Sequence, residues 1–526
     1  MSSPAQTHPR PSVDSTVVAH ASVGLLGSLL MMVAAIAIGW LPPTFNFAIN
    51  GWLQALRVSE NGQIVGSAAV ILGGALLLHA WLTLGIDVLN QRLTDVRQLW
   101  AILAMWLTPL VLVPPMFSRD VYSYVAQGRL MNSGIDPYLH GVSALPGWFQ
   151  LGSDPTWAES ATPYGPTFLG LAQFITSVTP HSPYWSMILF KALCLIGVAI
   201  SATAIARLAR HHGISPAAAN WLAILNPLVI MNLVVGAHND ALMIGFMVWA
   251  FVFAFENKPA FAIVMIALAA GVKPIALLAV PFVILAYLPR DLSRWQAIRS
   301  WTIGAFSTLA ILAALGYGLG IGIGWVDALG TPNEVRNLLS PTTAIGQAFG
   351  AGLGFFGFDA VDISIKIFQL CGTLAALCII AWLCLNPQGR SPIRGAGIAF
   401  LALIVLGPVV QPWYFMWALP LIAVAGIRKP WVLRAIIVGI GFFVIYGLAE
   451  INIVADSTIN ASDFISTSAA LLIVVLTLFA SPRERALIFG EELNRGLTPT
   501  SPELLSMYEN QKVSTNFLAN LRKAPR

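Results

Sequence analysis

Acidic, basic and aromatic residues interrupt the apolar runs of this chain at a few places, and the first such place is the most polar. Residues 117–138 read FSRDVYSYVAQGRLMNSGIDPY and directly follow the apolar run LWAILAMWLTPLVLVPPM at 99–116. A single carboxylate such as that of Asp120 can act as a general base toward a hydroxyl group. Helix capping by the same carboxylate is the competing interpretation, because acids are favoured where helices begin. The spacing alone is compatible with both roles.

Four further polar segments interrupt apolar runs, and three lysines lie inside such runs. The segments are GAHNDAL (236–242), GVKP (271–274), NEVRNLLSPTTAIG (333–346) and VVQPWYFMW (409–417), and the lysines are Lys191, Lys273 and Lys366. An ionisable group within a membrane is costly and is functional by default, although a lone lysine can also snorkel to the interface. Lysine and arginine neutralise phosphate, and Trp413, Tyr414 and Trp417 can stack on sugar rings or pack a lipid tail. Inverting glycosyl transfer needs one base and a good leaving group, so these residue types fit transfer from a lipid-linked sugar phosphate.

The composition places these residues in a polytopic membrane protein. The chain has 526 residues, of which 57% are hydrophobic and 10% are charged, whereas soluble domains have about 25% charged residues. The formal net charge of +5 comes largely from basic residues in short loops, which argues against nucleic-acid binding. The four cysteines all fall in apolar runs, so no disulfide framework or zinc site is expected.

The apolar runs predict an all-α protein with about 13 or 14 transmembrane helices. A bilayer core of about 30 Å needs roughly 20 apolar residues per helix. The predicted spans are 17–40, 63–86, 99–116, 185–206, 217–235, 241–256, 260–272, 275–288, 301–323, 362–385, 395–410, 413–427, 431–449 and 464–480. Proline breaks helices, so the pairs that meet at Lys273-Pro274 and Gln411-Pro412 could each be one broken helix. The stretches 165–179 and 342–357 are predicted to be re-entrant or interface helices in outer loops.

Basic residues in the loops indicate the orientation. With the N-terminus inside, the outer loops hold Arg57, Arg119, Arg129 and Arg336. The inner loops and tail hold Arg92, Arg97, Arg207, Arg210, Lys258, Arg290, Arg294, Arg299, Arg390, Arg394, Arg428, Lys429, Arg434, Arg483 and Arg485. By the positive-inside rule, this asymmetry places Asp120 and the other polar segments together on the outer face. The predicted organisation is a cytoplasmic polar N-terminus (1–16), a transmembrane catalytic domain (17–480) with an outer loop (117–184), and a cytoplasmic tail (481–526).

Several of these segments, in matching order over about residues 100–425, resemble one family. SRDVYSYVAQGRLMNSGIDPY, TPYGP, GAHNDALMIG, GVKP, LLSPTTAIG and QPWYFMWALP are similar to segments of the MptA/MptB family of GT-C-type α-1,6-mannopyranosyltransferases. The resemblance implies a GT-C fold in an actinobacterial plasma membrane, with the site on the periplasmic or extracellular side. It implies polyprenyl-phosphate-mannose as donor and an α-1,6-mannan on a phosphatidylinositol mannoside-type glycolipid as acceptor, in lipomannan and lipoarabinomannan synthesis. The transfer would proceed with inversion, and the initiating MptB type is the closer fit.

The resemblance also implies that Asp120 is the catalytic base, because GT-C enzymes carry an acid where the first large outer loop begins. The residues expected to bind substrate are Arg119, Tyr122, Tyr124, Lys191, His238, Asn239, Asp240, Lys273, Arg336, Lys366, Gln411 and Trp413. Residues two apart on a helix diverge by about 200°, so one of Tyr122 and Tyr124 is expected to face the site. Asp136 is expected mainly to brace the loop.

Individual roles are assigned to the remaining residues as hypotheses. Lys273 and Arg336 are expected to bind the donor phosphate, with Lys191 and Lys366 behind them, and His238 is expected to hydrogen-bond the same group. Asn239 and Asp240 either cap a helix or bind the acceptor. Gln411 and Trp413 are expected to contact the acceptor or lipid.

The sequence also bears on metal dependence and on alternative functions. Many GT-C enzymes carry two adjacent acids in the first loop, and paired acids often bear on metal binding. Here Arg119 precedes a single Asp120, so no metal and no other cofactor is expected. The same fold could instead use arabinose or glucose, since hydroxyl stereochemistry leaves no sequence signal. A lipid-linked sugar transporter or flippase is the alternative from another class; it should show matched repeats with polar groups near the midplane, and no internal repeat is evident.

Overall fold

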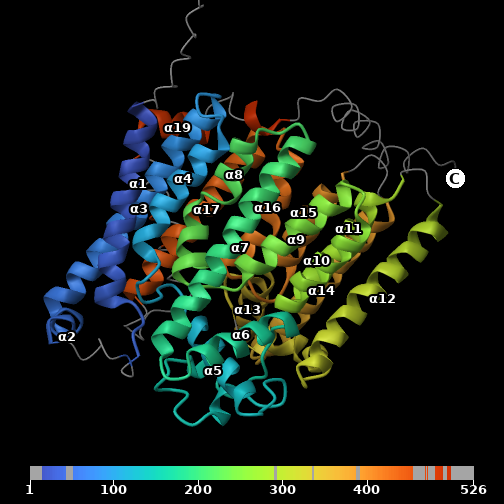
Figure 1. Cartoon of the computed structure of the whole chain (residues 1–526), viewed down its shortest axis with the longest axis horizontal. Helices are drawn as coiled ribbons and strands as arrows, with labels where there is room; N and C mark the ends of the chain where they lie inside the picture. The colour runs from blue at the N-terminus through green and yellow to red at the C-terminus, as the bar shows by residue number, and fades with distance from the viewer. Residues whose placement is uncertain are drawn as a thin grey trace, which may run out of the picture.

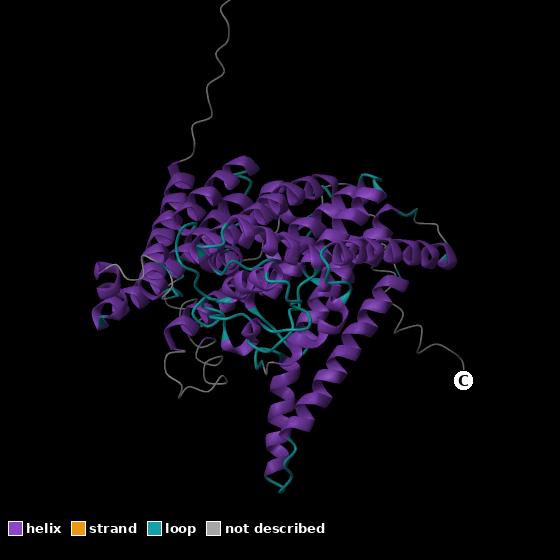
Figure 2. Cartoon of the chain, turned by 60° about the horizontal axis from the view of Figure 1, so that its bottom comes forward, coloured by secondary structure: helices purple, strands orange, loops and turns teal. Residues whose placement is uncertain are grey.

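The fold is all-α throughout the part of the chain that the structure describes (Figures 1 and 2). The structure is a computed structural model, and it describes residues 15–42, 45, 51–289, 293–334, 337–386, 391–453, 468, 471, 480–489 and 495–498. Its α-helices are α1 (Ser15–Ile38), α2 (Gly51–Val58), α3 (Glu60–Leu89), α4 (Val96–Leu107), α5 (Asp120–Asn132), α6 (Pro166–Val178), α7 (Pro183–His211), α8 (Pro216–Ala223), α9 (Asp240–Phe255), α10 (Pro259–Val272), α11 (Val280–Tyr287), α12 (Arg294–Gly318), α13 (Pro341–Gly354), α14 (Val361–Leu385), α15 (Pro392–Leu406), α16 (Phe415–Ala425), α17 (Pro430–Ile453) and α19 (Pro482–Phe489).

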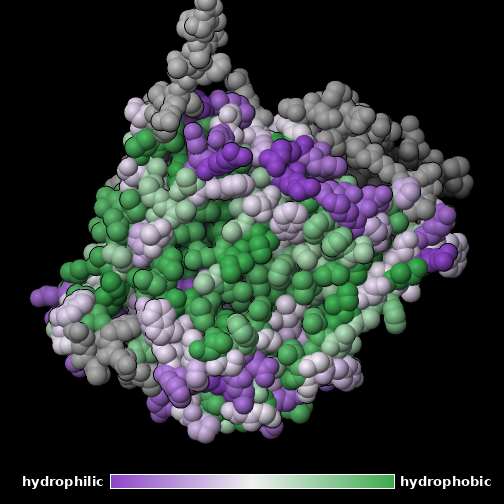
Figure 3. Space-filling model, in the orientation of Figure 1, coloured by the Kyte–Doolittle hydropathy of each residue, from purple (hydrophilic) through white to green (hydrophobic). Residues whose placement is uncertain are grey.

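Several of these helices are long and apolar enough to cross a membrane. Among the described residues, six helices meet this criterion, or up to seven if a pair bent by 110° counts as one span. The six are Val17–Ile38, Glu60–Leu89, Pro183–His211, Trp295–Gly318, Val361–Leu385 and Pro430–Ile451. An apolar band separates two polar ends of the molecule (Figure 3). The chain is therefore a polytopic membrane protein.

Most of the other predicted spans form shorter helices, which come as pairs that turn back at a polar tip. In one pair the chain runs through α8 and the π-helical turn Val229–Val235 and returns as α9, and the other pairs are α10 with α11 and α15 with α16 (Figure 1). Pro274 and Pro412 follow two of the tips, where a residue without an amide hydrogen cannot continue the helix. The 14 residues of α10 span about 21 Å, less than the about 30 Å of a bilayer core. If such a helix begins at one membrane surface, the tip at its other end lies within the apolar layer. The predicted span 464–480 lies largely outside the described residues.

Helices α5 and α6 pack against each other across the end of the molecule where these tips lie (Figure 1). The predicted re-entrant or interface stretch 165–179 corresponds to α6, which has 13 residues and also packs against α10. The predicted stretch 342–357 corresponds to α13, which packs along α14. The segment 117–184, which was predicted to be an outer loop, thus forms a layer next to the tips.

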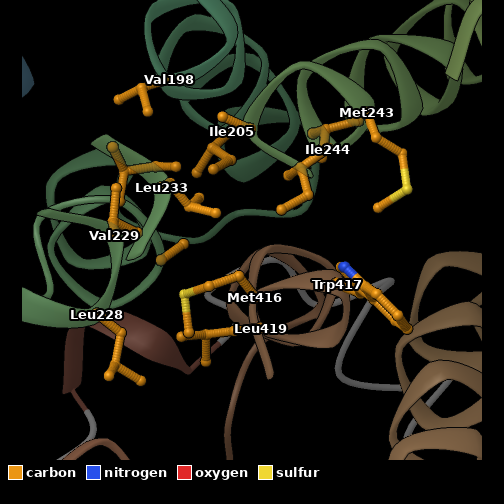
Figure 4. Packing of buried hydrophobic residues seen from close by; sticks show 14 of the residues in the cluster. Val198, Ile205, Leu228, Val229, Leu233, Met243, Ile244, Met416, Trp417 and Leu419 are labelled. Carbon is orange, nitrogen blue, oxygen red and sulfur yellow. The ribbon is translucent and has the colours of Figure 1, made fainter. Parts of the chain in front are cut away.

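Close helix packing fixes the start of α9. Figure 4 shows apolar side chains of α7, α9 and α16 in contact around this region. A Cβ atom added to Gly197 of α7 would lie 2.5 Å from the backbone nitrogen of Leu242, a distance that real Cβ atoms do not show. Only glycine therefore permits this approach of α7 to the first turn of α9.

Candidate active site

Polar segments that are far apart in the sequence meet on the side of the α5–α6 layer that faces the membrane helices (Figure 1). Asp120 begins α5, and its Oδ2 lies 3.5 Å from Nε2 of His238, which precedes α9. The ring of His238 stacks on that of Trp413 at the tip before α16, with centroids 3.8 Å apart. Lys273, at the end of α10, donates from Nζ to both carboxylate oxygens of Asp240 at 3.0 Å. Four separate segments thus contribute to one cluster, which is our candidate active site.

Asp120 is the acid of this cluster that remains accessible. Its side chain is 22% exposed, whereas that of Asp240 is fully buried. The N-cap of α5 is Arg119, whose side chain makes no capping bond, and the backbone amide of Asp120 donates to Oγ of Ser118 at 3.1 Å. The carboxylate of Asp120 is therefore not used in the capping role that was the alternative. Burial raises the pKa of the Asp120 carboxyl above its usual range, and the nearby charge of Lys273 opposes this shift in part. A carboxylate with a raised pKa is a stronger base toward a hydroxyl group.

Asp240 and Lys273 form a largely buried ion pair that is surrounded by aromatic rings. Trp417 donates from Nε1 to Oδ1 of Asp240 at 2.6 Å. The ammonium group of Lys273 lies 5.2 Å from the ring centroid of Tyr414, 5.3 Å from that of Trp417 and 6.0 Å from that of Tyr164. Such distances allow cation–π attraction. The positive charge of Lys273 is thus already compensated by Asp240, which weakens its predicted role as a phosphate ligand.

Arg119 braces the outer loop. Its Nε and Nη2 donate to the carbonyl of Gly152 at 3.1 and 2.9 Å, and Nη2 also donates to the carbonyl of Ser153 at 3.2 Å. Its guanidinium group lies 4.7 Å from the ring centroid of Trp40. These contacts hold the loop against the start of α5, where Asp120 lies.

Lys191 and Tyr122, which were predicted to bind substrate, are buried, and their polar groups are bonded to backbone carbonyls. Lys191 is fully buried in α7 and donates to the carbonyls of Leu110 and Val113 at 3.3 and 2.6 Å. Tyr122 is also fully buried and donates its hydroxyl to the carbonyl of Trp40. Both side chains therefore brace the protein.

Tyr124 faces an aromatic cluster beside the site. Its ring contacts Tyr164 edge-on, with centroids 5.3 Å apart, and Phe168 at 4.8 Å. Tyr164 in turn faces the ammonium group of Lys273. Of the two tyrosines of α5, Tyr124 is thus the one that lies toward the site, in the second layer of side chains.

The other predicted residues have different surroundings. Asn239 is the N-cap of α9, yet its side chain makes no capping bond, and both of its polar side-chain atoms are buried without a hydrogen-bond partner in the described part of the chain. Gln411 is half-buried and opens the turn before α16. Lys366 is exposed on α14, and no contact in the described part of the chain joins it to Asp120. Arg336 lies outside the described residues.

A hydrogen-bonded brace holds the tip that carries Gln411 and Trp413. Asn337 accepts on Oδ1 from the backbone amide of Val410 at 3.4 Å. Ser340, the N-cap of α13, donates to the carbonyl of Gly407 at 2.7 Å. The segment LLSPTTAIG thus contributes to the site by positioning the adjacent tip.

Four residues that contact the cluster were not among those predicted to bind substrate: Tyr164, Asn232, Tyr414 and Trp417. Tyr414 and Trp417 were recognised as aromatic partners for a sugar or lipid, but their contacts with the ion pair were not foreseen. Trp417 lies four residues after Trp413 in a helical stretch, and that spacing was an available signal. Tyr164 lies in the motif TPYGP. Asn232, whose carbonyl oxygen lies 2.7 Å from Nδ1 of His238, gave no signal because a π-helical turn presents it.

The donor atoms of this cluster do not form an evident metal site. No group of three or more histidine, cysteine, aspartate or glutamate side chains suited to a metal ion occurs within the described ranges. Asp240 is committed to Lys273 and Trp417. Metal independence stays a prediction.

An all-α membrane fold that places an accessible carboxylate over aromatic side chains fits a membrane-embedded glycosyltransferase, and comparison with known proteins identifies the family. The family "Alpha-(1->6)-mannopyranosyltransferase, N-terminal domain" matches residues 21–289, and "MptB C-terminal domain" matches residues 342–480. The chain belongs to this α-(1→6)-mannopyranosyltransferase family, as the sequence predicted. It is therefore a hexosyltransferase that transfers mannose.

Curated relatives cover most of the chain. A probable α-(1→6)-mannopyranosyltransferase of Mycolicibacterium smegmatis is 34% identical over 79% of this chain and 81% of its own length. An α-(1→6)-mannopyranosyltransferase of Mycobacterium tuberculosis is 32% identical with the same coverage. The α-(1→6)-mannopyranosyltransferase A of that organism is 30% identical over 77% of this chain and 79% of its own. No solved structure matches the chain.

Proposed function

We propose that this protein transfers mannose from polyprenyl-phosphate-mannose to an α-1,6-mannan acceptor on a phosphatidylinositol mannoside-type glycolipid, in lipomannan and lipoarabinomannan synthesis. The observation that carries the proposal is the position of Asp120. Its carboxylate is accessible, has a raised pKa and lies where three polar tips meet the outer-loop layer. A donor anchored by a prenyl chain in the membrane would bring its sugar near the tips, because helices as short as α10 do not cross the whole bilayer core.

In the proposed reaction Asp120 removes the proton from the attacking hydroxyl of the acceptor. The oxygen attacks C1 of the mannosyl group from the face opposite the phosphate, so a β-linked donor gives an α-linked product. The bond between C1 and the phosphate oxygen breaks, and its electron pair leaves with the phosphate. Because Asp240 compensates Lys273, we expect Arg336 and Lys366 to be the remaining candidates for binding the phosphate.

The donor class can be tested with the purified protein in lipid nanodiscs. Labelled polyprenyl-phosphate-mannose, a labelled nucleotide-mannose and polyprenyl phosphates of arabinose and glucose are supplied with a short α-1,6-mannoside. We expect transfer from polyprenyl-phosphate-mannose alone. Transfer from the nucleotide sugar would contradict the proposed donor class, and transfer of arabinose or glucose in place of mannose would support the alternative sugars.

We further propose that the site faces the periplasm, because the loops at the opposite end are the basic ones. In a cysteine-free background, Leu139→Cys in the outer loop should react with a membrane-impermeant maleimide in intact cells with a permeable outer envelope. Leu139 is 76% exposed. Lys258→Cys, in the exposed turn between α9 and α10, should react only after the membrane is opened. The reverse labelling pattern would overturn the orientation.

Metal independence has its own test. We expect mannosyl transfer to persist within about twofold after dialysis against EDTA, because one base and a phosphate leaving group suffice for the reaction. The measurement is the transfer rate before and after dialysis, with magnesium and manganese added back separately. Loss of activity that a divalent cation restores would show that the site needs a metal.

A further inference from the structure

The two ring nitrogens of His238 have different surroundings. Nδ1 lies 2.7 Å from the carbonyl oxygen of Asn232. A carbonyl oxygen can only accept, so Nδ1 carries the proton and donates it. In the neutral ring Nε2 then holds a lone pair. This atom lies 3.5 Å from Oδ2 of Asp120, is buried, and has no hydrogen-bond partner among the described residues.

Three elements hold the ring in this orientation. The π-helical turn Val229–Val235 presents the carbonyl of Asn232, and π-helical turns occur frequently at functional sites. Ala237, directly before His238, adopts a φ of 55°, a left-handed conformation that is unfavourable for alanine. Trp413 stacks on the ring at an interplanar angle of 25°.

We propose that His238 is a positioning residue that acts through Asp120. Once Asp120 has taken the proton of the attacking sugar hydroxyl, Nε2 of His238 accepts a hydrogen bond from the protonated carboxyl. This inference rests on the proposed role of Asp120 as base. When Asp120 is ionised, the lone pair of Nε2 faces an oxygen without hydrogen, and no hydrogen bond joins the two atoms. When Asp120 becomes protonated, its O–H can donate to Nε2. The bond therefore forms as the reaction proceeds, and an interaction gained in the transition state lowers the barrier.

The proton and electron balance is complete without a further reactant. The acceptor O–H bond breaks and its proton moves to the Asp120 carboxylate. The acceptor oxygen forms the bond to C1, and the C1–phosphate bond breaks with its electron pair on the phosphate. The proton then rests in the hydrogen bond between Asp120 and His238, from which the released lipid phosphate or water can take it.

The other ionisable groups around His238 are otherwise engaged. Asp240 from α9 and Lys273 from α10 are paired with each other. Cys194 from α7 contacts the backbone of His238. Asp154, from the outer loop near Asp120, accepts from the backbone amide of Thr156 at 2.9 Å. Asp120 is thus the group to which Nε2 is directed.

The same tautomer disfavours the expectation that His238 binds the donor phosphate. A phosphate oxygen needs a donor, and Nε2 of the neutral ring is an acceptor. The two roles predict different kinetic changes. Loss of a phosphate ligand raises the KM for the donor. Loss of the hydrogen-bond acceptor Nε2 lowers kcat and changes the pH dependence of kcat.

The test compares His238→Asn with His238→Gln. The amide of asparagine can replace Nδ1–H toward the carbonyl of Asn232 but leaves no lone pair at the position of Nε2. Glutamine can place an amide oxygen near that position. Cys194→Ala changes the packing beside His238 and serves as the control. For each variant kcat, donor KM and the pH profile of kcat are measured with polyprenyl-phosphate-mannose, beside wild type and Asp120→Asn.

For H238N we expect kcat to fall about 10- to 100-fold, with donor KM within about twofold. The acid limb of the kcat profile should move to lower pH, because Asp120 loses a partner for its protonated form. H238Q should recover part of kcat and of the shift, and C194A should resemble wild type. If H238N does not accumulate in the membrane, the acid limb of the kcat profile of H238Q provides the test. This limb should lie at lower pH than that of wild type.

Three results would overturn the inference: an unchanged kcat, a lower kcat with an unmoved acid limb, or a raised donor KM alone. The inference and the proposed function fail in different ways. An inactive wild type or a fully active Asp120→Asn would contradict the proposed function. An active wild type and an inactive Asp120→Asn, together with an H238N profile like that of wild type, would contradict this inference alone.

Discussion

Replacing Asp120 by asparagine should lower kcat for mannosyl transfer by about 10²- to 10⁴-fold, the range that a positioned general base contributes. Asparagine keeps the size of the side chain and its ability to hydrogen-bond, but it cannot take up the acceptor proton. Donor binding should be unchanged within about twofold. The measurement is the steady-state rate with polyprenyl-phosphate-mannose, together with equilibrium binding of a non-transferable donor analogue.

The role of Asp120 as base also predicts how the rate of the wild type depends on pH. Burial raises the pKa of Asp120, and the base works only when ionised. The rate should therefore fall as the pH is lowered through this raised pKa, and the acid limb should lie above the about 3.9 of an unperturbed aspartate. Asp136→Asn is the matched control, because Asp136 accepts from the backbone amide of Tyr138 at 2.8 Å in the same loop. Activity of D120N within tenfold of wild type would assign the base elsewhere.

Replacing Lys273 by methionine should destabilise the protein strongly. Methionine has a similar length but leaves the buried carboxylate of Asp240 without its cation. Breaking a buried ion pair by removing one partner costs about 3–5 kcal/mol. The midpoint of thermal inactivation in detergent should fall clearly, and the double variant Lys273→Met with Asp240→Asn should recover part of the loss.

This prediction separates the structural role of Lys273 from the phosphate role assigned from the sequence. Lys273→Arg keeps the charge and serves as the conservative control. A ligand of the donor phosphate would show a raised donor KM with unchanged stability when replaced by methionine. That outcome would contradict the account of the buried pair.

The grouping of polar segments was predictable because it follows from the alternation of spans and from the basic loops. Asp120, His238, Asp240, Lys273 and Trp413 were all named as site residues from the sequence, and the structure brings them together. What the sequence could not supply was which of them are partners. The pairing of Lys273 with Asp240, 33 residues apart in the chain, depends on how two helix pairs pack.

The hydrogen-bond partners of Lys191 could have been anticipated from a proline in another segment of the sequence. The carbonyl of Leu110 would pair in a helix with the amide of residue 114, which is a proline and has no hydrogen to donate. The helix therefore ends there, and Lys191 satisfies this carbonyl and that of Val113. The partners of Arg119 are carbonyls of a loop more than 30 residues away, and loop conformation of this kind has no local sequence signal.

The most direct test of the central claim is the structure of the product. Wild-type protein is incubated with labelled β-linked polyprenyl-phosphate-mannose and a short α-1,6-mannoside, and the linkage and anomeric configuration of the transferred mannose are determined by NMR. Our account predicts an added α-1,6-mannose, formed by wild type and reduced at least about 100-fold by Asp120→Asn. A β-configured product, or the absence of transfer to both short and lipid-linked acceptors, would contradict it.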